Sequence, residues 1–229
     1  MPNKLSILTR SLCAASLAVS SAAALAQAKD NAPVALSSAE QLTQDKPKSE
    51  SWSYAKPGLN TAKYKHLMVE NTLVYDGPDA QFDDVDPGDR NQYAGILTAE
   101  LRSELGKVIP IATKSGPNTM RLQVTLIGVD KTKGGAATAT RATPVGFGFN
   151  ALKSAIGKPG SLTGSVLIGV ELFDAKSGEL LLAAVRRRSP DALDIPATLS
   201  TTDTVKAVAR DFAKAARERL TKMNAQRAP

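Results

Sequence analysis

The sequence predicts an α+β fold, in which helices pack mainly on one face of an antiparallel-rich mixed β-sheet. Three observations predict it. Alternating apolar residues over 119–130 indicate a strand, and a turn at Asp174–Gly178 lies between two further strand-like stretches. Apolar residues at three- and four-residue spacing over 91–105 and 202–223 indicate amphipathic helices. Such helices bury their apolar stripe against a sheet, which gives the α+β class.

The first predicted element is a strand over His66–Tyr75, where most side chains are apolar. An acidic loop follows it, and the first predicted helix covers Asn91–Leu105. Asp86 or Asp89 is the expected N-cap, with Pro87 tolerated in the first turn. A glycine directly after the helix is typical of a C-terminus. The apolar stripe of this helix consists of Tyr93, Ile96, Leu97, Leu101 and Leu105.

The middle of the chain predicts two strands and a short helix. Val108–Ala112 is a short strand, and Thr119–Asp130 is a long one. A Gly-rich segment over 134–160 follows, in which Thr143-Pro144 could begin a helix that runs to about Ile156. The long strand is expected to place Leu122, Val124 and Leu126 on one face and Arg121, Gln123 and Thr125 on the other.

The C-terminal part predicts a hairpin and a long helix. Leu162–Phe173 is a strand, Asp174–Gly178 is the turn, and Glu179–Arg188 returns antiparallel. Thr202–Met223 is the last helix, and the complete predicted order is β-α-β-β-α-β-β-α. The buried positions expected here are Val166, Ile168, Val170 and Leu172 on the strand, and Val205, Val208, Ala209, Phe212, Ala216 and Leu220 on the helix.

Residues 1–28 are typical of a cleavable secretory signal peptide. Two cations in the first ten residues precede an apolar run over Leu12–Leu25, and small residues then predict cleavage before Gln27 or Lys29. The alternative is a membrane anchor, but a spanning helix needs about 20 apolar residues, and this run is shorter and rich in Ala and Ser. No later stretch is apolar enough to predict a transmembrane helix in the mature chain.

The expected domain organisation follows from composition. Residues 29–62 are polar with little periodicity and are predicted to be a flexible linker or arm, while 63–224 form a single α/β domain and 225–229 a disordered tail. The aromatic residues Trp52 and Tyr54, with Leu59, are expected to dock the end of the arm onto the domain.

The only cysteine, Cys13, precedes the apolar run and lacks the preceding small residues that a lipoprotein acceptor cysteine requires. It is expected to leave with the signal peptide, so the mature chain has no disulfide and no thiol chemistry. An exported, non-lipidated periplasmic protein is therefore favoured, and a lipid-anchored one is the alternative.

Catalytic and metal-binding patterns are weak. His66 is the only histidine, and without a Gly-x-Ser-x-Gly elbow or a mature cysteine no catalytic residue is assigned. One histidine cannot form a zinc site, no glycine-rich phosphate motif is complete, and no metal site or cofactor is assigned. An acidic loop is the only calcium candidate, but its spacing is not that of an EF-hand; its members are Asp76, Asp79, Asp83, Asp84, Asp86 and Asp89.

Charge provides the one candidate binding surface. The full chain has a net charge of +7 with 29 basic and 22 acidic residues; removing the two cations of residues 1–28 leaves 27 − 22 = +5. A basic exported protein can bind lipid head groups, a cell-wall polymer or an acidic envelope protein. Export and few aromatic residues argue against nucleic acid. The candidate residues are Arg186, Arg187, Arg188, Lys206, Arg210, Lys214 and Arg217.

Several stretches resemble a known family of Gram-negative envelope proteins, the domain of unknown function 3313. They are YKHLMVENTLVYD, GPNTMRLQVT, TRATPVGFGFNALKSAIGKPGSLTG, VELFDAKSGELL and ATLSTTD, within residues 50–222, and the third is the most specific. The resemblance implies an exported, outer-membrane-associated and often lipid-anchored protein without an assigned reaction. The sequence thus favours a non-enzymatic binding or envelope-assembly module. The alternative is a carboxylate-dependent hydrolase of envelope glycans, which would need two carboxylates facing across a cleft.

Overall fold

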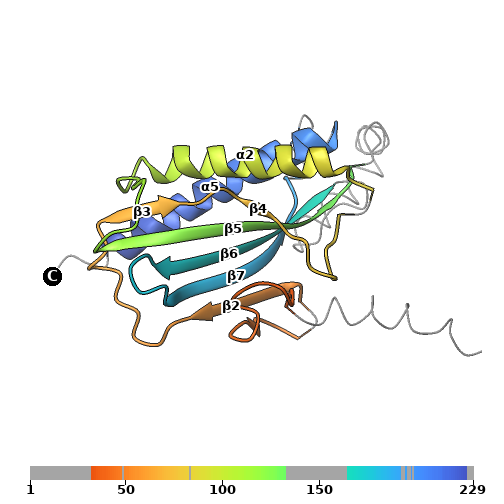
Figure 1. The fold of residues 1–229 in the computed structure, drawn as a ribbon. Coiled ribbons are helices and arrows are strands. Elements are labelled where there is room, and N and C mark those ends of the chain that lie inside the picture. The colour runs from red at the N-terminus through yellow and green to blue at the C-terminus, as the bar shows by residue number, and fades with distance from the viewer. Residues whose placement is uncertain are drawn as a thin grey trace, which may run out of the picture.

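A seven-stranded mixed sheet carries two long helices (Figure 1). The computed structural model describes residues 32–132 and 164–225, apart from 48, 83, 192, 193, 195, 196 and 198. The described elements are β1 (Thr43–Gln44), β2 (Ser51–Ala55), β3 (His66–Val69), β4 (Leu73–Val74), α2 (Pro87–Leu105), β5 (Thr119–Asp130), β6 (Ser165–Asp174), β7 (Leu180–Arg188) and α5 (Thr201–Ala225).

The sheet is mostly antiparallel, which confirms the predicted class. Its strand order is β1-β2-β7-β6-β5-β3, and β4 also pairs with β5. The pairings from β1 to β5 are antiparallel, whereas β3 and β4 both run parallel to β5. The hairpin between β6 and β7 forms at the predicted turn, where Gly178 has a φ of +74°, a conformation that favours glycine.

Strand β5 has the predicted alternation up to Leu126, beyond which a register shift occurs before Gly128. A Cβ atom on Gly128 would lie 2.4 Å from the carbonyl oxygen of Gln81, so only glycine allows this approach. The shift also returns Val129, three residues after Leu126, to the helix side of the sheet, while Ile127 is buried on the opposite face. Beyond the shift both faces of the strand are buried, although the sequence predicted only one buried face.

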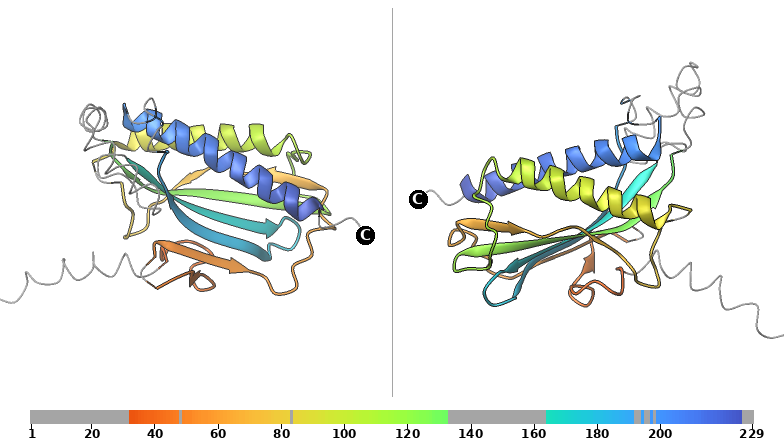
Figure 2. Two further views of the ribbon diagram at one scale, coloured as in Figure 1. Left: turned by 180° about the vertical axis from the view of Figure 1, so that it is seen from behind. Right: turned by 45° about the horizontal axis from the view of Figure 1, so that its top comes forward.

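Both described helices cover the same face of the sheet (Figure 2). α2 begins after Asp86 with Pro87 in its first turn, as predicted, and Gly106 follows its last residue. Gly106 keeps a right-handed φ of −59°; its lack of a side chain matters because a Cβ would lie 2.9 Å from the carbonyl oxygen of Arg102. α5 begins with Ser200 as its N-cap, whose hydroxyl accepts the backbone N–H of Asp203 and donates to the carboxylate of the same residue.

The main core lies between the helices and the sheet. It joins α2, α5 and strands β3, β5, β6 and β7, and burying each large apolar side chain contributes roughly 1.5–3 kcal/mol. Its most deeply buried members include Tyr64, Leu97, Leu101, Met120, Leu126, Ile168, Val166 and Val205.

The N-terminal region differs from the predicted linker. Residues 43–55 contain β1 and β2, which extend the sheet beyond β7. Residues 32–42, here called the N-terminal strap, pack on the sheet face opposite the helices. Their apolar side chains Leu36 and Leu42 form a second core with Trp52, Ile127, Leu167 and Val185. The prediction of a flexible arm was wrong because a few apolar anchors are enough to bind a polar segment to an open sheet face.

Two further predictions are corrected. The strand over His66–Tyr75 is interrupted between β3 and β4, because α2 side chains satisfy the backbone there: Arg102 donates to the Val69 carbonyl at 2.8 Å and Thr98 accepts the Thr72 N–H. Val108–Ala112 is not a strand; it contributes one bridge, between Ile111 and Leu67.

The described order is therefore β-β-β-β-α-β-β-β-α, in place of the predicted β-α-β-β-α-β-β-α. The helix predicted from Thr143 to about Ile156, and the predicted signal peptide, lie outside the described residues.

Candidate functional site

The three consecutive arginines at the end of β7 do not share one surface. Arg187 points to the strap side of the sheet, where it forms ion pairs with Glu50 and Asp130, the latter at 2.9 Å. It also donates to Gln81 and, at 2.9 Å, to the Ser165 hydroxyl. These contacts leave its side chain only 16% exposed. Arg187 therefore ties together β2, β5, β6 and the loop before α2, and it is not free for an outside ligand.

Arg186 and Arg188 point to the helix side, since their partners in the β6 ladder are Ile168 and Val166. Arg186 forms an ion pair with Asp45 at 2.7 Å and donates to the Trp52 carbonyl at 2.5 Å. These contacts attach the β1–β2 edge to β7. Arg188 is exposed, with no ion-pair partner among the described residues.

Three of the predicted helix cations form an exposed row on α5. Lys206, Arg210 and Lys214 are four residues apart, which places them along one flank of the helix. No carboxylate of the described part of the chain forms an ion pair with them. A helix flank with several unpaired cations is an electrostatic surface for anions. We call these three residues the α5 row.

Arg217 continues this flank but pairs with α2. Its guanidinium lies 2.6 Å from the carboxylate of Glu104, which also contacts Lys107. The hydrogen bond from Lys107 lowers the pKa of Glu104, and the charges of Lys107, Arg217 and Lys214 lower it further against the opposing effect of burial. This carboxylate is thus fixed as an anion that joins the two helices.

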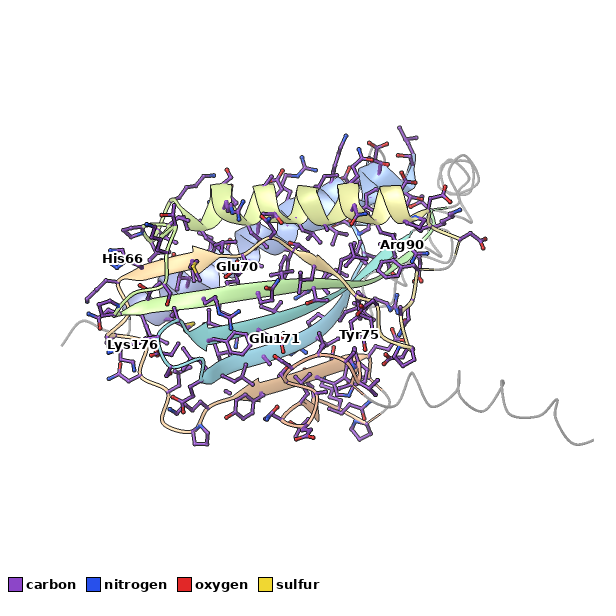
Figure 3. All side chains as sticks on the ribbon, in the orientation of Figure 1. His66, Glu70, Tyr75, Arg90, Glu171 and Lys176 are labelled. Atoms are coloured by element: carbon purple, nitrogen blue, oxygen red, sulfur yellow. The ribbon has the colours of Figure 1, made fainter. Side chains whose placement is uncertain are left out.

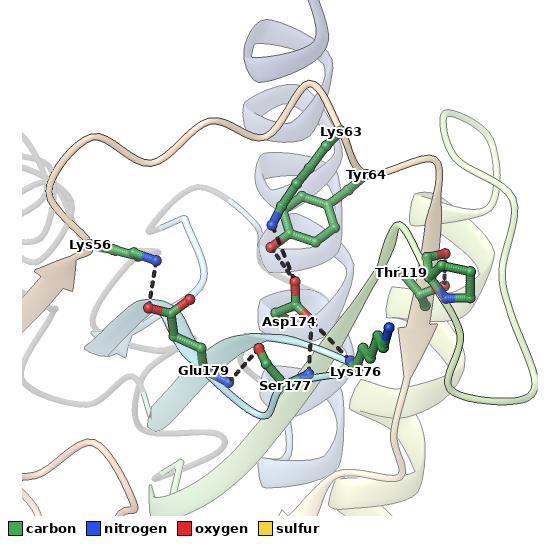
Figure 4. A network of polar contacts seen from close by, with 9 residues as sticks. Lys56, Lys63, Tyr64, Thr119, Asp174, Lys176, Ser177 and Glu179 are labelled. Carbon is green, nitrogen blue, oxygen red and sulfur yellow. Dashed lines mark hydrogen bonds and ion pairs between the residues drawn. The ribbon is translucent and has the colours of Figure 1, made fainter.

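A second polar cluster lies at the hairpin end of the sheet (Figure 4). The carboxylate of Asp174 accepts the backbone N–H groups of Lys176 and Ser177 at 3.0 Å and the hydroxyl of Tyr64 at 2.9 Å. The bond from Ser177 and then that from Tyr64 hold the pKa of Asp174 well below its usual range. The cluster closes the hairpin turn and anchors the segment before β3, so its geometry is structural.

The strap is held by buried polar groups (Figure 3). Glu171, only 5% exposed, accepts the Ser37 hydroxyl at 2.7 Å and the Ser38 N–H at 2.8 Å. Tyr75 accepts the Ala35 N–H at 2.9 Å and donates to Asp79 at 2.6 Å. Burial raises the pKa of Tyr75 well above its usual value, and the bond to Asp79 raises it further. These carboxylates therefore serve the strap and do not face a cleft.

The carboxylates described above all serve contacts within the domain. His66 is exposed at the start of β3, and no three metal-ligating side chains converge in the described part. The displaced pKa values of Asp174 and Glu104 are both lowered, whereas a general acid needs a raised one. A shallow hollow of about 490 Å³ between the strap and Trp52 is lined mainly by apolar side chains.

Sequence reasoning missed some functional and structural groups. Arg219 of α5 is exposed, and the helical spacing places it on the flank opposite the α5 row, so it was not among the predicted cations. The strand pattern over 162–173 does not indicate the role of Glu171, because its partners come from the strap, more than 130 residues away.

The fold and surface define a small α+β protein with a basic helix flank. The chain belongs to the family described as protein of unknown function DUF3313, whose model matches residues 33–216. This confirms the resemblance seen in the sequence. Among curated proteins, none is similar in sequence to this chain. Neither described helix has the apolar run that crossing a membrane requires, and the rest of the described chain holds no such helix.

Solved structures with distantly similar folds include three from different bacteria. They are the PelC dodecamer from Paraburkholderia phytofirmans (12% identity, TM-score 0.37, 72% of this chain and 97% of that one), a candidate lipoprotein from Caulobacter crescentus (13%, 0.33, 74% and 96%), and a DUF4136 family protein from Bacteroides thetaiotaomicron (11%, 0.32, 73% and 95%). These similarities are too low to carry a function to this chain.

Proposed function

We propose that this chain is an exported cell-envelope protein that acts by binding, and that its α5 row meets the anionic head groups of a lipid surface. The observation that carries the proposal is the line of three exposed cations, Lys206, Arg210 and Lys214, without ion-pair partners in the described residues. An anionic lipid surface attracts each such cation by about 1 kcal/mol. Three cations then give roughly 3 kcal/mol, about a hundredfold in affinity.

The rest of α5 supports contact through this flank without unfolding. The apolar side of the helix is buried against the sheet, where Val205, Ala209 and Ala213 are fully covered. The helix therefore cannot insert its apolar face into a bilayer while the domain stays folded. We propose an adsorbed protein held by charge, whose binding weakens as salt screens the interaction.

Export is the second part of the proposal. Residues 1–28 have the pattern of a signal peptide, and the mature chain is then expected to begin at Gln27 or Lys29. The family description assigns no activity, and the carboxylates Glu104, Glu171 and Asp174 are all engaged in contacts within the domain, which does not favour a glycan hydrolase. Recovery of the full-length chain from the cytoplasm would contradict this part.

The test is binding of the mature protein to vesicles of phosphatidylglycerol and phosphatidylcholine at low salt. The triple variant Lys206→Gln, Arg210→Gln and Lys214→Gln removes the α5 row. A matched triple variant, Lys65→Gln, Lys114→Gln and Lys176→Gln, removes the same charge from exposed positions of the domain outside α5. We expect the first variant to lose on the order of a hundredfold in affinity and the second to lose much less.

Equal losses of vesicle affinity in the two variants would show that net charge alone causes binding. That result would contradict a specific binding surface on α5. Binding to vesicles of phosphatidylcholine alone, at the same strength, would contradict charge as the cause.

A further inference from the structure

The hollow between the strap and Trp52 lies at the edge of the sheet that β1 and β2 form; we call it the strap hollow. Its volume is about 490 Å³, within the roughly 300–1,000 Å³ that is usual for ligand pockets. Trp52 is 4% exposed, whereas Val34 is 59% exposed. An apolar group that entered the hollow would therefore remove Val34 from water as well. The apolar lining residues are Ala32, Val34, Ala39, Leu42 and Trp52.

The free edge of β1 lies beside the strap hollow. β1 is the last strand of the described sheet on this side, and the side chain of its Gln44 lines the hollow. Gln44 lies opposite Trp52, and the next residue, Asp45, donates its N–H to the Ser51 carbonyl at 2.9 Å. Because antiparallel ladders alternate between bonded and non-bonded pairs, the N–H and C=O of Gln44 point away from β2. These two groups are placed to pair with an added strand, which is how extended peptides join a sheet edge.

The lining of the strap hollow contains one charged side chain, Glu40. It is exposed, and no cation of the described residues forms an ion pair with it. The other polar lining side chain, Gln44, donates its amide to the Ser49 carbonyl at 2.7 Å. The free carboxylate favours an occupant that carries a cation beside its apolar group, and it repels an anionic lipid head group.

We propose that the strap hollow and the free edge of β1 bind an extended segment of a partner protein, in which an apolar and a basic residue are two positions apart. The backbone of the segment pairs with Gln44, its apolar side chain enters the hollow, and its basic side chain meets Glu40. The spacing of two follows because alternate residues of a strand share a face. The strap covers the sheet face opposite α5 (Figure 2), so this surface goes beyond lipid binding and does not depend on it.

The test uses the fluorescence of Trp52, which is the single tryptophan of the chain and lines the strap hollow. The probe is a short threonine peptide, blocked at both ends, with one leucine and one lysine two positions apart. Titration of the mature protein at low salt is expected to change the Trp52 emission until it saturates. Replacing the leucine of the probe by alanine is expected to weaken binding on the order of tenfold, because less apolar area is buried.

A matched pair of variants tests the β1 edge. Gln44→Pro removes the outward N–H, whereas Gln44→Ala removes the same side chain and keeps that N–H. Proline is tolerated on an edge strand where the N–H takes no part in the ladder. The proline variant is expected to bind the leucine–lysine probe on the order of fivefold more weakly than the alanine variant, because one hydrogen bond is lost.

A second pair of variants tests the charge. Glu40→Gln is expected to weaken binding of the leucine–lysine probe by up to about fivefold, the usual range for an exposed ion pair. It should leave unchanged the binding of a probe with glutamine in place of lysine. Glu218→Gln removes the same charge from an exposed position of α5 and should bind both probes like the wild type.

The proposal is overturned if no probe changes the Trp52 emission at millimolar concentration, or if the leucine and alanine probes bind equally. Equal affinities of Gln44→Pro and Gln44→Ala would contradict pairing with β1. An emission change caused only by phosphatidylglycerol vesicles would assign the hollow to lipid, and one caused only by dilution of the protein would assign it to a second copy; either overturns the proposal. Loss of vesicle binding in the α5-row variant leaves these outcomes untouched, so the two proposals fail separately.

Discussion

In this protein, individual side chains connect segments that are far apart in sequence. Asp174 terminates β6, closes the hairpin turn and accepts the hydroxyl of Tyr64, which lies 110 residues earlier. Arg187 does the same at the other end of the sheet for four separate segments. The sequence predicts the turn at Asp174, because turn residues act locally. It does not predict the partner Tyr64, because that contact depends on the parallel placement of β3 beside β5.

Asp174→Asn is expected to destabilise the fold by about 1–2 kcal/mol at neutral pH, since the amide nitrogen cannot accept the Tyr64 hydroxyl. The pKa of Asp174 is lowered in the folded state, so its charge stabilises the fold above the ordinary carboxyl pKa near 4. This stabilisation is lost as the pH falls through the lowered value. The difference between wild type and variant in urea unfolding should therefore be full above about pH 5 and shrink below pH 4.

Glu179→Gln is the control for this residue. Its ion pair with Lys56 is 2.5 Å long but both side chains are well exposed, at 51% and 37%, and such pairs contribute less than about 1 kcal/mol. A gap between Asp174→Asn and wild type that stays constant down to pH 2 would contradict the assigned role of the charge.

At the scale of elements, periodic segments were predictable and edge segments were not. β5 and α5 come from long stretches with a strong two- or 3.6-residue period, and β5 matches the predicted bounds while α5 differs at its ends by one or two residues. β1 and β2 were missed because they are short, polar on one face and stabilised by Trp52 and the strap. The segment Val108–Ala112 does not form the predicted strand. It is apolar, but it pairs with a neighbouring strand at only one position.

An added Cβ atom is expected to have opposite effects on stability at two glycines, Gly128 and Gly95. Gly128→Ala places a Cβ atom against the backbone oxygen of Gln81, and overpacking of this kind costs about 1–3 kcal/mol. Gly95→Ala lies within α2, where a Cβ would meet no atom within 4 Å, so it should stabilise by up to about 1 kcal/mol through helix propensity. Urea unfolding of the two variants measures these opposite signs. Stabilisation by Gly128→Ala would contradict the close approach of the loop before α2.

At the scale of the whole molecule, the two faces of the sheet are covered by different parts of the chain. The helices and the main core occupy one face, and the strap covers the other (Figures 1 and 2). The cations predicted to form one binding surface are separated by this arrangement. Arg187 and Arg217 form internal ion pairs. Lys206, Arg210 and Lys214 stay exposed. The sequence predicted the helix spacing, but which cations pair internally depends on tertiary contacts that it does not specify.

The central claim, an exported protein that meets anionic lipid through α5, is tested most directly by photo-crosslinking in intact cells. A photoreactive amino acid replaces Arg210 in one strain and Glu40, on the exposed strap of the opposite face, in another. Mass spectrometry of the recovered chain then reports its first residue and any bound lipid together. The account predicts a chain that begins at Gln27 or Lys29 and carries phospholipid from position 210 but not from position 40. An uncleaved chain, or equal lipid labelling at both positions, would contradict it.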